Sequence, residues 1–439
     1  MSNYRKWLLS EVELWLNQGI IDSEQANKIS TLYPYQADTN WGKIVFAGIG
    51  SVIFGLGIIL VFAYNWQDMH RFTKLGVVLL SVAITHGIGF YYSHDQSAHK
   101  KVGESLHLLG TMLFGAGIWL VAQVYHIDEH YPNALFVWAL GALLIAWLLP
   151  SLSHTILALG LVFLWHWFEV FEFHSRNHFA IWLVLAAILP LAWRLRSRGT
   201  VLLTCCLTIF SYSASYIIVA DSNEETLFNV IIALSGSMII GSFLASKSYF
   251  PQSQNIIRFV GVSVFAVLLF IFSFSEFDDA FFAQPISQVT TLTWLYYCLP
   301  IVLLSTALFF VLARFRHALE DKIDLIEILL VSATCYIAFV SAFSSLGLYG
   351  IAWIIYSLLF LAYSIVLIYR GTRYLRWQPT TLGGLMLASY TFARFMDLFD
   401  SLLWRGMAFL VVGAMLFGIG LYYSRQKQLA EQRGGATND

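Results

Sequence analysis

From about residue 41 to residue 424, the chain is a succession of apolar runs separated by short polar breaks. An α-helix needs about twenty residues to cross the ~30 Å hydrocarbon core of a bilayer, where it satisfies its own backbone hydrogen bonds. The sequence therefore predicts an all-α fold, a polytopic transmembrane helical bundle of about fourteen spans. We expect these spans at residues 43–64, 73–92, 104–125, 133–149, 153–171, 178–194, 199–220, 226–246, 256–275, 290–313, 323–344, 347–369, 379–396 and 403–423.

The composition excludes most other classes of protein. Hydrophobic residues make up 58% of the chain and charged residues 12%, whereas soluble domains carry about 25% charged residues. A water-soluble enzyme and a secreted disulfide scaffold are therefore excluded as descriptions of the whole chain, and the four cysteines form no CxxC pair. The formal net charge of −1 provides no basic excess for a nucleic acid. We expect membrane lipid, and no nucleic acid, as a partner.

The basic residues predict the orientation of the spans. Of the 25 Lys and Arg residues, 20 fall on the same side as the N-terminus if there are fourteen spans. Cytoplasmic loops are enriched in Lys and Arg, so both termini are expected in the cytoplasm. The opposite, outer side receives five basic residues: Arg71, Lys74, Arg176, Arg394 and Arg405.

The N-terminus is expected to form a small helical hairpin. A first amphipathic helix fits residues 4–18 and would end at Gly19 in a left-handed conformation, while Asp22 followed by Gln25 is typical of a capping box that opens a second helix. Residues 1–34 would lie on the bilayer, pack on the protein's own loops or bind a protein partner. The expected domains are a cytoplasmic amphipathic helical hairpin (1–40), a transmembrane domain (41–424) and a cytoplasmic tail (425–439).

A glycine-rich segment recurs along the chain. Residues 50–57 (GSVIFGLG) are repeated sixty residues later at 110–117 (GTMLFGAG), and a third copy lies at 413–420 (GAMLFGIG). The repeat predicts a duplicated helical hairpin, at about 43–92 and 104–149. Glycines at these spacings let helix backbones approach closely; the alternative is a set of inverted repeats around a substrate site at the membrane midplane. The expected helix-packing glycines are Gly50, Gly55, Gly57, Gly110, Gly115, Gly117, Gly413, Gly418 and Gly420.

Several of these segments together resemble a known family. They are residues 15–22 (WLNQGIID), 41–43 (WGK), 63–66 (AYNW) and 119–126 (WLVAQVYH). They are similar to the bacterial family catalogued as domain of unknown function 2157, over residues 1 to about 150. The resemblance implies a multi-pass protein of the bacterial cytoplasmic (inner) membrane. It implies no activity, because the family has no established one.

Histidines and carboxylates crowd the predicted outer face. The duplication aligns Asp68 and His70 with Asp128 and His130. If the side chains converge, imidazole and carboxylate ligands would suit zinc, copper or iron, or could relay protons. The alternative is a set of solvated loop residues, and the absence of an HExxH motif leaves a metal unassigned. The candidate outer-face residues are Asp68, His70, His126, Asp128, Glu129, His130, His166 and Glu169.

Polar residues within the spans are further candidates, because lipid cannot satisfy them. Near a span end, snorkelling toward the interface is the alternative. No Walker A motif, dinucleotide-binding GxGxxG or nucleophile elbow is present, so we expect no cofactor and no catalytic residue. The polar residues concerned are Asn65, His86, Gln123, Tyr125, Arg258 and Arg394.

Three classes of function remain. A carrier or flippase-like transporter of a small solute or lipid fits the many spans, the repeats and the short loops. A membrane scaffold or sensor could act through the N-terminal helices. A membrane-embedded enzyme could use the outer-face histidines and carboxylates, although the sequence leans against an enzyme. The oligomeric state is left open.

Overall fold

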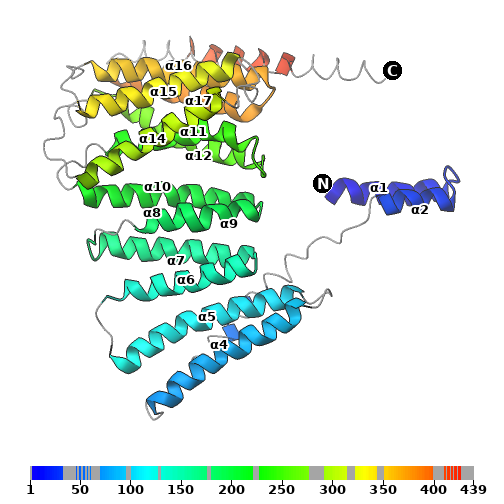
Figure 1. The fold of residues 1–439 in the computed structure, drawn as a ribbon. Coiled ribbons are helices and arrows are strands. Elements are labelled where there is room, and N and C mark those ends of the chain that lie inside the picture. Colours follow the sequence, from blue (N-terminus) through cyan, green and yellow to red (C-terminus); the bar gives the residue numbers. More distant parts are fainter. Residues whose placement is uncertain are drawn as a thin grey trace. The chain divides into compact units, whose positions relative to one another are not determined.

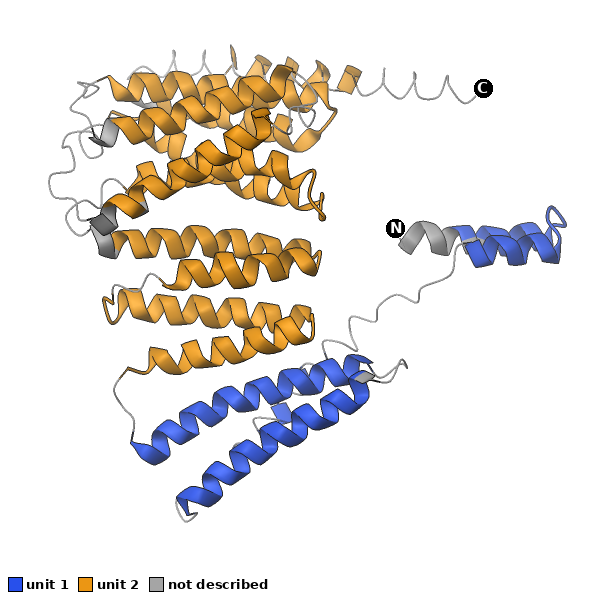
Figure 2. Cartoon of the chain, in the orientation of Figure 1, with its two compact units in different colours: residues 1–129 blue, residues 130–439 orange. Residues whose placement is uncertain are grey.

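The computed structural model describes most of the chain. The described residues are 2–32, 70–94, 100–126, 130–175, 179–220, 227–275, 291–313, 322–343 and 351–398, with scattered helical positions between 46 and 60 and between 410 and 426. They form helices and connecting turns, with no strand among them, so the expected all-α fold is confirmed. The chain divides into two compact units, residues 1–129 (unit 1) and residues 130–439 (unit 2), which Figure 2 shows in different colours.

Unit 1 begins with a helical hairpin whose turn has the expected caps. Gly19 has a φ of +70°, and the Ile20 N–H donates to the Trp15 carbonyl at 2.9 Å, as in a Schellman motif. The Asp22 N–H donates to Gln25 Oε1 at 3.1 Å, and the Gln25 N–H donates to Asp22 Oδ1 at 2.7 Å. This is the predicted capping box. The helices of unit 1 are α1 (Ser2–Asn17), α2 (Ser23–Leu32), α4 (Arg71–His94) and α5 (Lys100–Tyr125).

Helices α4 and α5 form a hairpin that is held together at glycines. Gly103, Gly110 and Gly117 recur every seven residues on α5. A Cβ atom built at Gly103 would overlap Ser93 of α4, and one at Gly117 would overlap Val78. Because no side chain separates the backbones at these positions, the two helices approach closely there.

In unit 2, helices α6 to α10 are stacked in chain order, and helices α11 to α17 form a more closely grouped bundle (Figure 1). Helix α11 packs on α12, α14 and α15, and α16 packs on α12 and α17. The largest apolar core lies among α11, α12, α14, α15 and α16, around Phe243, Phe265 and Tyr363. The helices of unit 2 are α6 (Pro132–Leu148), α7 (Leu152–Phe171), α8 (Phe179–Leu183), η1 (Val184–Ile188), α9 (Leu189–Arg194), α10 (Arg198–Ala220), α11 (Leu227–Ala245), α12 (Ser253–Phe272), α14 (Thr291–Ala313), α15 (Lys322–Phe343), α16 (Ala352–Arg373) and α17 (Trp377–Leu398).

The span expected at 178–194 is interrupted by a different type of helix. A π-helical turn, η1, separates α8 from α9, and Pro190 stands in the first turn of α9. Proline donates no backbone hydrogen bond, and its ring crowds the carbonyl four residues earlier. The wider turn before Pro190 relieves this conflict.

The helices have the dimensions of membrane spans. Among the described residues, eight helices are long and apolar enough to cross a bilayer, and three shorter apolar helices accompany them. In the most apolar window of α11, 67% of the residues are buried inside the structure, against 6% for α4. Thus α11 lies in the interior of unit 2, whereas the window of α4 is little buried.

Candidate functional site

The expected outer-face cluster is divided between the two units. His70 and His126 belong to unit 1, while His130, His166 and Glu169 belong to unit 2. Asp68, Asp128 and Glu129 lie outside the described residues. Among the residues that the structure describes, no three His, Cys, Asp or Glu side chains are placed to hold a metal ion.

Within unit 2, the structure brings His130 and Glu169 together. His130 precedes α6, and its Nε2 atom lies 2.8 Å from Oε1 of Glu169 in the last turn of α7. The indole N–H of Trp165 donates to the same carboxylate oxygen at 3.2 Å. Glu169 is buried, so its charge is compensated by these donors. The contact joins the start of α6 to the end of α7.

The neighbouring tyrosine forms a second link between the same two helix ends. The Tyr131 hydroxyl donates to Glu172 Oε2 at 2.5 Å. Desolvation, followed by this hydrogen bond and the negative charge of Glu172, raises the pKa of Tyr131 to about 12. Tyr131 therefore stays protonated at neutral pH and acts as a donor, with no role as a base.

His166 does not join the Glu169 contact, although it lies only three positions before Glu169 on α7. Its Nε2 atom lies 3.2 Å from the Ser211 carbonyl and 3.4 Å from Ser215 Oγ, both on α10. His166 is fully buried. Although their spacing is i, i+3, His166 therefore contacts α10, whereas Glu169 contacts His130.

A larger ionic cluster lies among α12, α15 and α16. We define the buried charge network as Arg258, Asp324, Glu327 and Arg370. Arg258 Nη2 donates to Glu327 Oε1, and Arg370 Nη1 donates to Glu327 Oε2 at 2.6 Å. The same Arg370 nitrogen lies 2.5 Å from Asp324 Oδ1. Tyr363 donates to Glu327 at 3.5 Å.

The buried charge network is formally neutral and enclosed. Its two guanidinium groups balance its two carboxylates, and Glu327 is 0% exposed while Arg370 is 6% exposed. The ring of Phe243 lies 5.3 Å from the Arg258 guanidinium carbon and 5.5 Å from that of Arg370, within cation–π range. Removal of one partner would leave a buried charge uncompensated, which costs far more than the pair itself contributes.

A third arginine, Arg394, joins α12, α16 and α17. We define the Arg394 site as Arg394, Ser273, Ser357, Tyr390 and Trp353. Arg394 Nη2 donates to the Ser273 carbonyl at the C-terminal end of α12 and to Ser357 Oγ at 3.2 Å. Arg394 Nε lies 3.3 Å from the Tyr390 hydroxyl, and the guanidinium carbon lies 4.8 Å from the Trp353 ring. A cation at a helix C-terminus also meets the negative end of the helix dipole.

The buried charge network and the Arg394 site lie at opposite ends of the same helices. On α16, thirteen residues separate Ser357 from Arg370, which corresponds to roughly 20 Å along the helix. On α12, Arg258 lies in the first turns and Ser273 directly follows the last. Helices α12 and α16 are therefore linked near one end through Glu327 of α15 and near the other end through Arg394 of α17.

Sequence reasoning found only part of these two sites. The sequence singles out Arg258 and Arg394 as polar residues within apolar runs, but Asp324, Glu327 and Arg370 are not among the predicted candidates. The signal that could have found the carboxylates was their i, i+3 spacing at the start of an apolar run. Arg370 gives no such signal, because it follows the apolar part of its span.

Unit 1 contains a separate pair of histidines. His86 Nδ1 on α4 lies 3.0 Å from His107 Nδ1 on α5, so one nitrogen must donate a single proton that the other accepts. A Cβ atom at Gly110 would lie 2.7 Å from His86 Nε2, and one at Gly89 would lie 3.2 Å from His107 Cδ2. Because Gly89 and Gly110 have no side chain, they leave space for the imidazole rings of His107 and His86.

The other repeat glycines lie in different surroundings. Gly115 is buried within α5, and Gly55 lies outside the described residues. A Cβ atom at five others would meet no described heavy atom within 4 Å: Gly50, Gly57, Gly413, Gly418 and Gly420. Among the described repeat glycines with a close neighbour on another helix are therefore Gly110 and Gly117, both in the second copy of the repeat.

The comparisons with known proteins concern the N-terminal part of the chain. Residues 13–155 match the family described as "Predicted membrane protein (DUF2157)", which is the family that the sequence resembles. The match ends before the buried charge network and the Arg394 site. No curated protein and no solved structure matches the chain. Together with the long apolar helices, the family match shows an integral membrane protein that contacts lipid.

Proposed function

We propose that the protein is a carrier or flippase-like transporter of a small solute or lipid in the bacterial cytoplasmic membrane. In this proposal the chain has about fourteen spans, and both termini and the N-terminal helical hairpin are cytoplasmic. The observation that carries the proposal is that polar contacts of arginines link α12 to α16 near both ends, through Glu327 of α15 in the buried charge network and through Arg394 of α17 in the Arg394 site. A carrier needs one set of contacts that closes the inner end of its helices and another that closes the outer end, and the two open in alternation around a site between them. We call these two sets of contacts the closures.

The chemistry of the two closures suits reversible opening. Apolar helices gain little by contacting one another instead of lipid, so polar contacts decide which helix ends stay together. In the buried charge network, Arg370 bonds to two carboxylates, and charge-assisted bonds to ionised acceptors are the stronger class. In the Arg394 site, Arg394 bonds to the Ser273 carbonyl and the Ser357 hydroxyl.

The proposal assigns the two closures to opposite membrane faces. Arg370 is followed by Arg373 and Arg376, and such basic clusters are typical of cytoplasmic ends. The buried charge network therefore forms the inner closure and the Arg394 site the outer one. Arg258 Nη1 is buried and has no hydrogen-bond partner among the described residues. A solute with an anionic or carbonyl oxygen would satisfy this donor when the inner closure opens.

Chemical labelling of a buried position between the closures tests the proposal. Ser364 lies on α16 between Ser357 and Arg370 and is 0% exposed. We expect Ser364→Cys, in a chain whose four native cysteines are replaced, to react slowly with a membrane-impermeant maleimide in proteoliposomes. The reaction should accelerate when Glu327→Gln weakens the inner closure.

The control is Ser242→Cys on α11, which is also 0% exposed but does not lie between the two closures on α16. It should react more slowly than Ser364→Cys and should not respond to Glu327→Gln. If Ser364→Cys remains unreactive in both backgrounds, the helices do not open to water. A static bundle, as expected of a scaffold, would then be favoured over a carrier.

A further inference from the structure

Three arginines alternate along the turn that joins α9 to α10 in unit 2. Residues 193–198 have the sequence WRLRSR, and the side chains of Arg194, Arg196 and Arg198 are exposed. We define these three residues as the arginine surface. The turn lies on the same side of unit 2 as the turns between α6 and α7 and between α11 and α12, on the right in Figure 1.

Contacts with the turn between α11 and α12 hold two of the arginines in place. Arg198 donates from Nε and from Nη2 to Gln252 Oε1, at 3.0 and 2.8 Å. The guanidinium carbon of Arg196 lies 3.8 Å from the centroid of the Tyr249 ring, within cation–π range. These guanidinium groups are therefore ordered before any ligand binds, which lowers the entropic cost of binding one.

None of these contacts compensates the positive charge. Gln252 and Tyr249 are neutral, and Arg194 donates to the Trp147 carbonyl at 3.4 Å. Within the part of the chain that the structure describes, the three arginines form no ion pair, and the sequence contains no Asp or Glu at residues 173–220 or 226–275. Helix α10 begins at Arg198, and α12 begins directly after Gln252, so the positive ends of two helix dipoles add to the same charge. The arginine surface therefore favours an anion.

The arginine surface lies where membrane spans begin. Segments long and apolar enough to cross a bilayer begin at Arg198 and at Ser253. The indole N–H of Trp193 donates to Ser248 Oγ at 3.1 Å, and Tyr249 is exposed. Trp and Tyr are enriched at the boundary between hydrocarbon and headgroups. This position favours a lipid headgroup over a soluble acidic protein as the source of the anion.

We infer that the arginine surface binds the phosphate group of an anionic phospholipid, whose acyl chains stay in the surrounding bilayer. Arginine forms paired hydrogen bonds with phosphate oxygens, and a guanidinium stacked on a ring, as Arg196 is on Tyr249, keeps the N–H groups at its edge for such bonds. A zwitterionic headgroup would bring its own cation to the arginines, so charge complementarity favours a net anionic lipid. The inference does not depend on transport.

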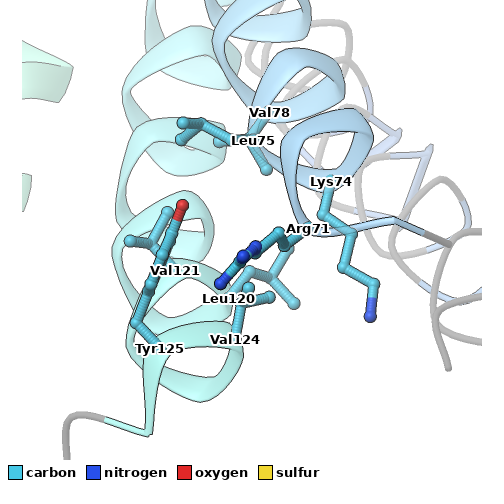
Figure 3. Close-up of a pocket in the computed structure, with 8 residues that line it drawn as sticks. All are labelled: Arg71, Lys74, Leu75, Val78, Leu120, Val121, Val124 and Tyr125. Carbon is cyan, nitrogen blue, oxygen red and sulfur yellow. The ribbon is translucent and has the colours of Figure 1, made fainter.

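Two basic residues at the start of α4 provide the comparison. Figure 3 shows that the Arg71 side chain extends toward α5, whereas Lys74 points away from it. Because the two charges diverge, they do not form a surface that could hold one phosphate between them. The variant Arg71→Gln/Lys74→Gln therefore serves as the matched control, since it also removes two positive charges.

Native mass spectrometry of the full-length protein in detergent tests this inference, with dioleoyl phosphatidylglycerol and dioleoyl phosphatidylcholine as probes. We expect the first phosphatidylglycerol molecule to bind more tightly than phosphatidylcholine. Arg196→Gln/Arg198→Gln should lose about tenfold or more of that affinity. Should this variant not fold, Arg194→Gln/Arg196→Gln, which leaves the bonds between Arg198 and Gln252 in place, replaces it. The control Arg71→Gln/Lys74→Gln should change the affinity by less than about twofold.

A variant that keeps every charge tests whether the arrangement of the arginines matters. Gln252→Leu removes the acceptor that orders Arg198 and should weaken phosphatidylglycerol binding by about threefold. The inference is overturned if Gln252→Leu binds like the wild type, if the control weakens binding as much as the arginine variant, or if phosphatidylcholine binds as tightly as phosphatidylglycerol. It is also overturned if millimolar inorganic phosphate displaces the lipid, because the surface would then recognise a free anion.

Discussion

Replacing Glu327 with Gln is expected to destabilise the full-length protein in detergent by about 3–5 kcal/mol. Glu327 accepts hydrogen bonds from Arg258 and Arg370 and is 0% exposed. The amide keeps the shape of the carboxylate but removes its charge, so two guanidinium groups remain buried with Asp324 as the only carboxylate of the network. Unfolding by sodium dodecyl sulfate titration, followed by circular dichroism, measures the loss.

The matched control is an ion pair on the surface. Glu24 and Lys28 lie 2.8 Å apart on α2, with side chains 77% and 72% exposed. Glu24→Gln should change the free energy of unfolding by no more than about 0.5 kcal/mol. The double variant Glu327→Gln/Arg258→Gln restores the charge balance of the network and should recover part of the loss. Equal, small effects of Glu327→Gln and Glu24→Gln would show that Glu327 is not enclosed with two arginines.

The second large effect is expected at a glycine between α16 and α17. A Cβ atom at Gly383 would lie 2.7 Å from the Ser364 carbonyl oxygen and 3.0 Å from the Ile368 backbone nitrogen. Backbone atoms of α16 cannot move aside as a flexible side chain can. Gly383→Ala should therefore separate the two helices and cost about 1–3 kcal/mol, as measured by the same titration.

Gly241 on α11 provides the control for Gly383. A Cβ atom there would meet no described heavy atom within 4 Å. Gly241→Ala should be neutral, or stabilising by up to about 1 kcal/mol, because alanine favours a helix over glycine. If Gly383→Ala is tolerated as well as Gly241→Ala, α16 and α17 do not pack at the distance described.

The positions of the helices could be predicted from the sequence because hydropathy alone locates a membrane span. The run at 104–125, for example, lies within α5 (Lys100–Tyr125). The π-helical turn at Val184–Ile188 could not be predicted in this way. Hydropathy does not determine which backbone carbonyl accepts the hydrogen bond of each N–H. The sequence feature that indicates an irregular helix here is Pro190.

The candidate sites were harder to predict, because they depend on pairing between distant helices. Sequence reasoning identified Arg258 as a polar residue in an apolar run, but its partner Glu327 is 69 residues away. It also grouped His166 with Glu169, which the fold directs to different neighbours. The repeat indicated Gly110 and Gly117, but Gly383 and its close contact lie outside any repeat. The spacing of residues along one helix predicts which side chains share a face, but it does not predict which other helix that face contacts.

The most direct test of the proposed carrier compares distances at the two ends of α12 and α16 in the same membranes. Spin labels at Asn255→Cys on α12 and Tyr369→Cys on α16 would report the inner end, and labels at Ser275→Cys and Ile351→Cys the outer end; all four positions are exposed. Pulsed electron paramagnetic resonance in proteoliposomes should show two distance populations at each end. Glu327→Gln should enrich the longer distance inside and the shorter distance outside. A single distance at each end, unchanged by Glu327→Gln, would contradict alternating closure.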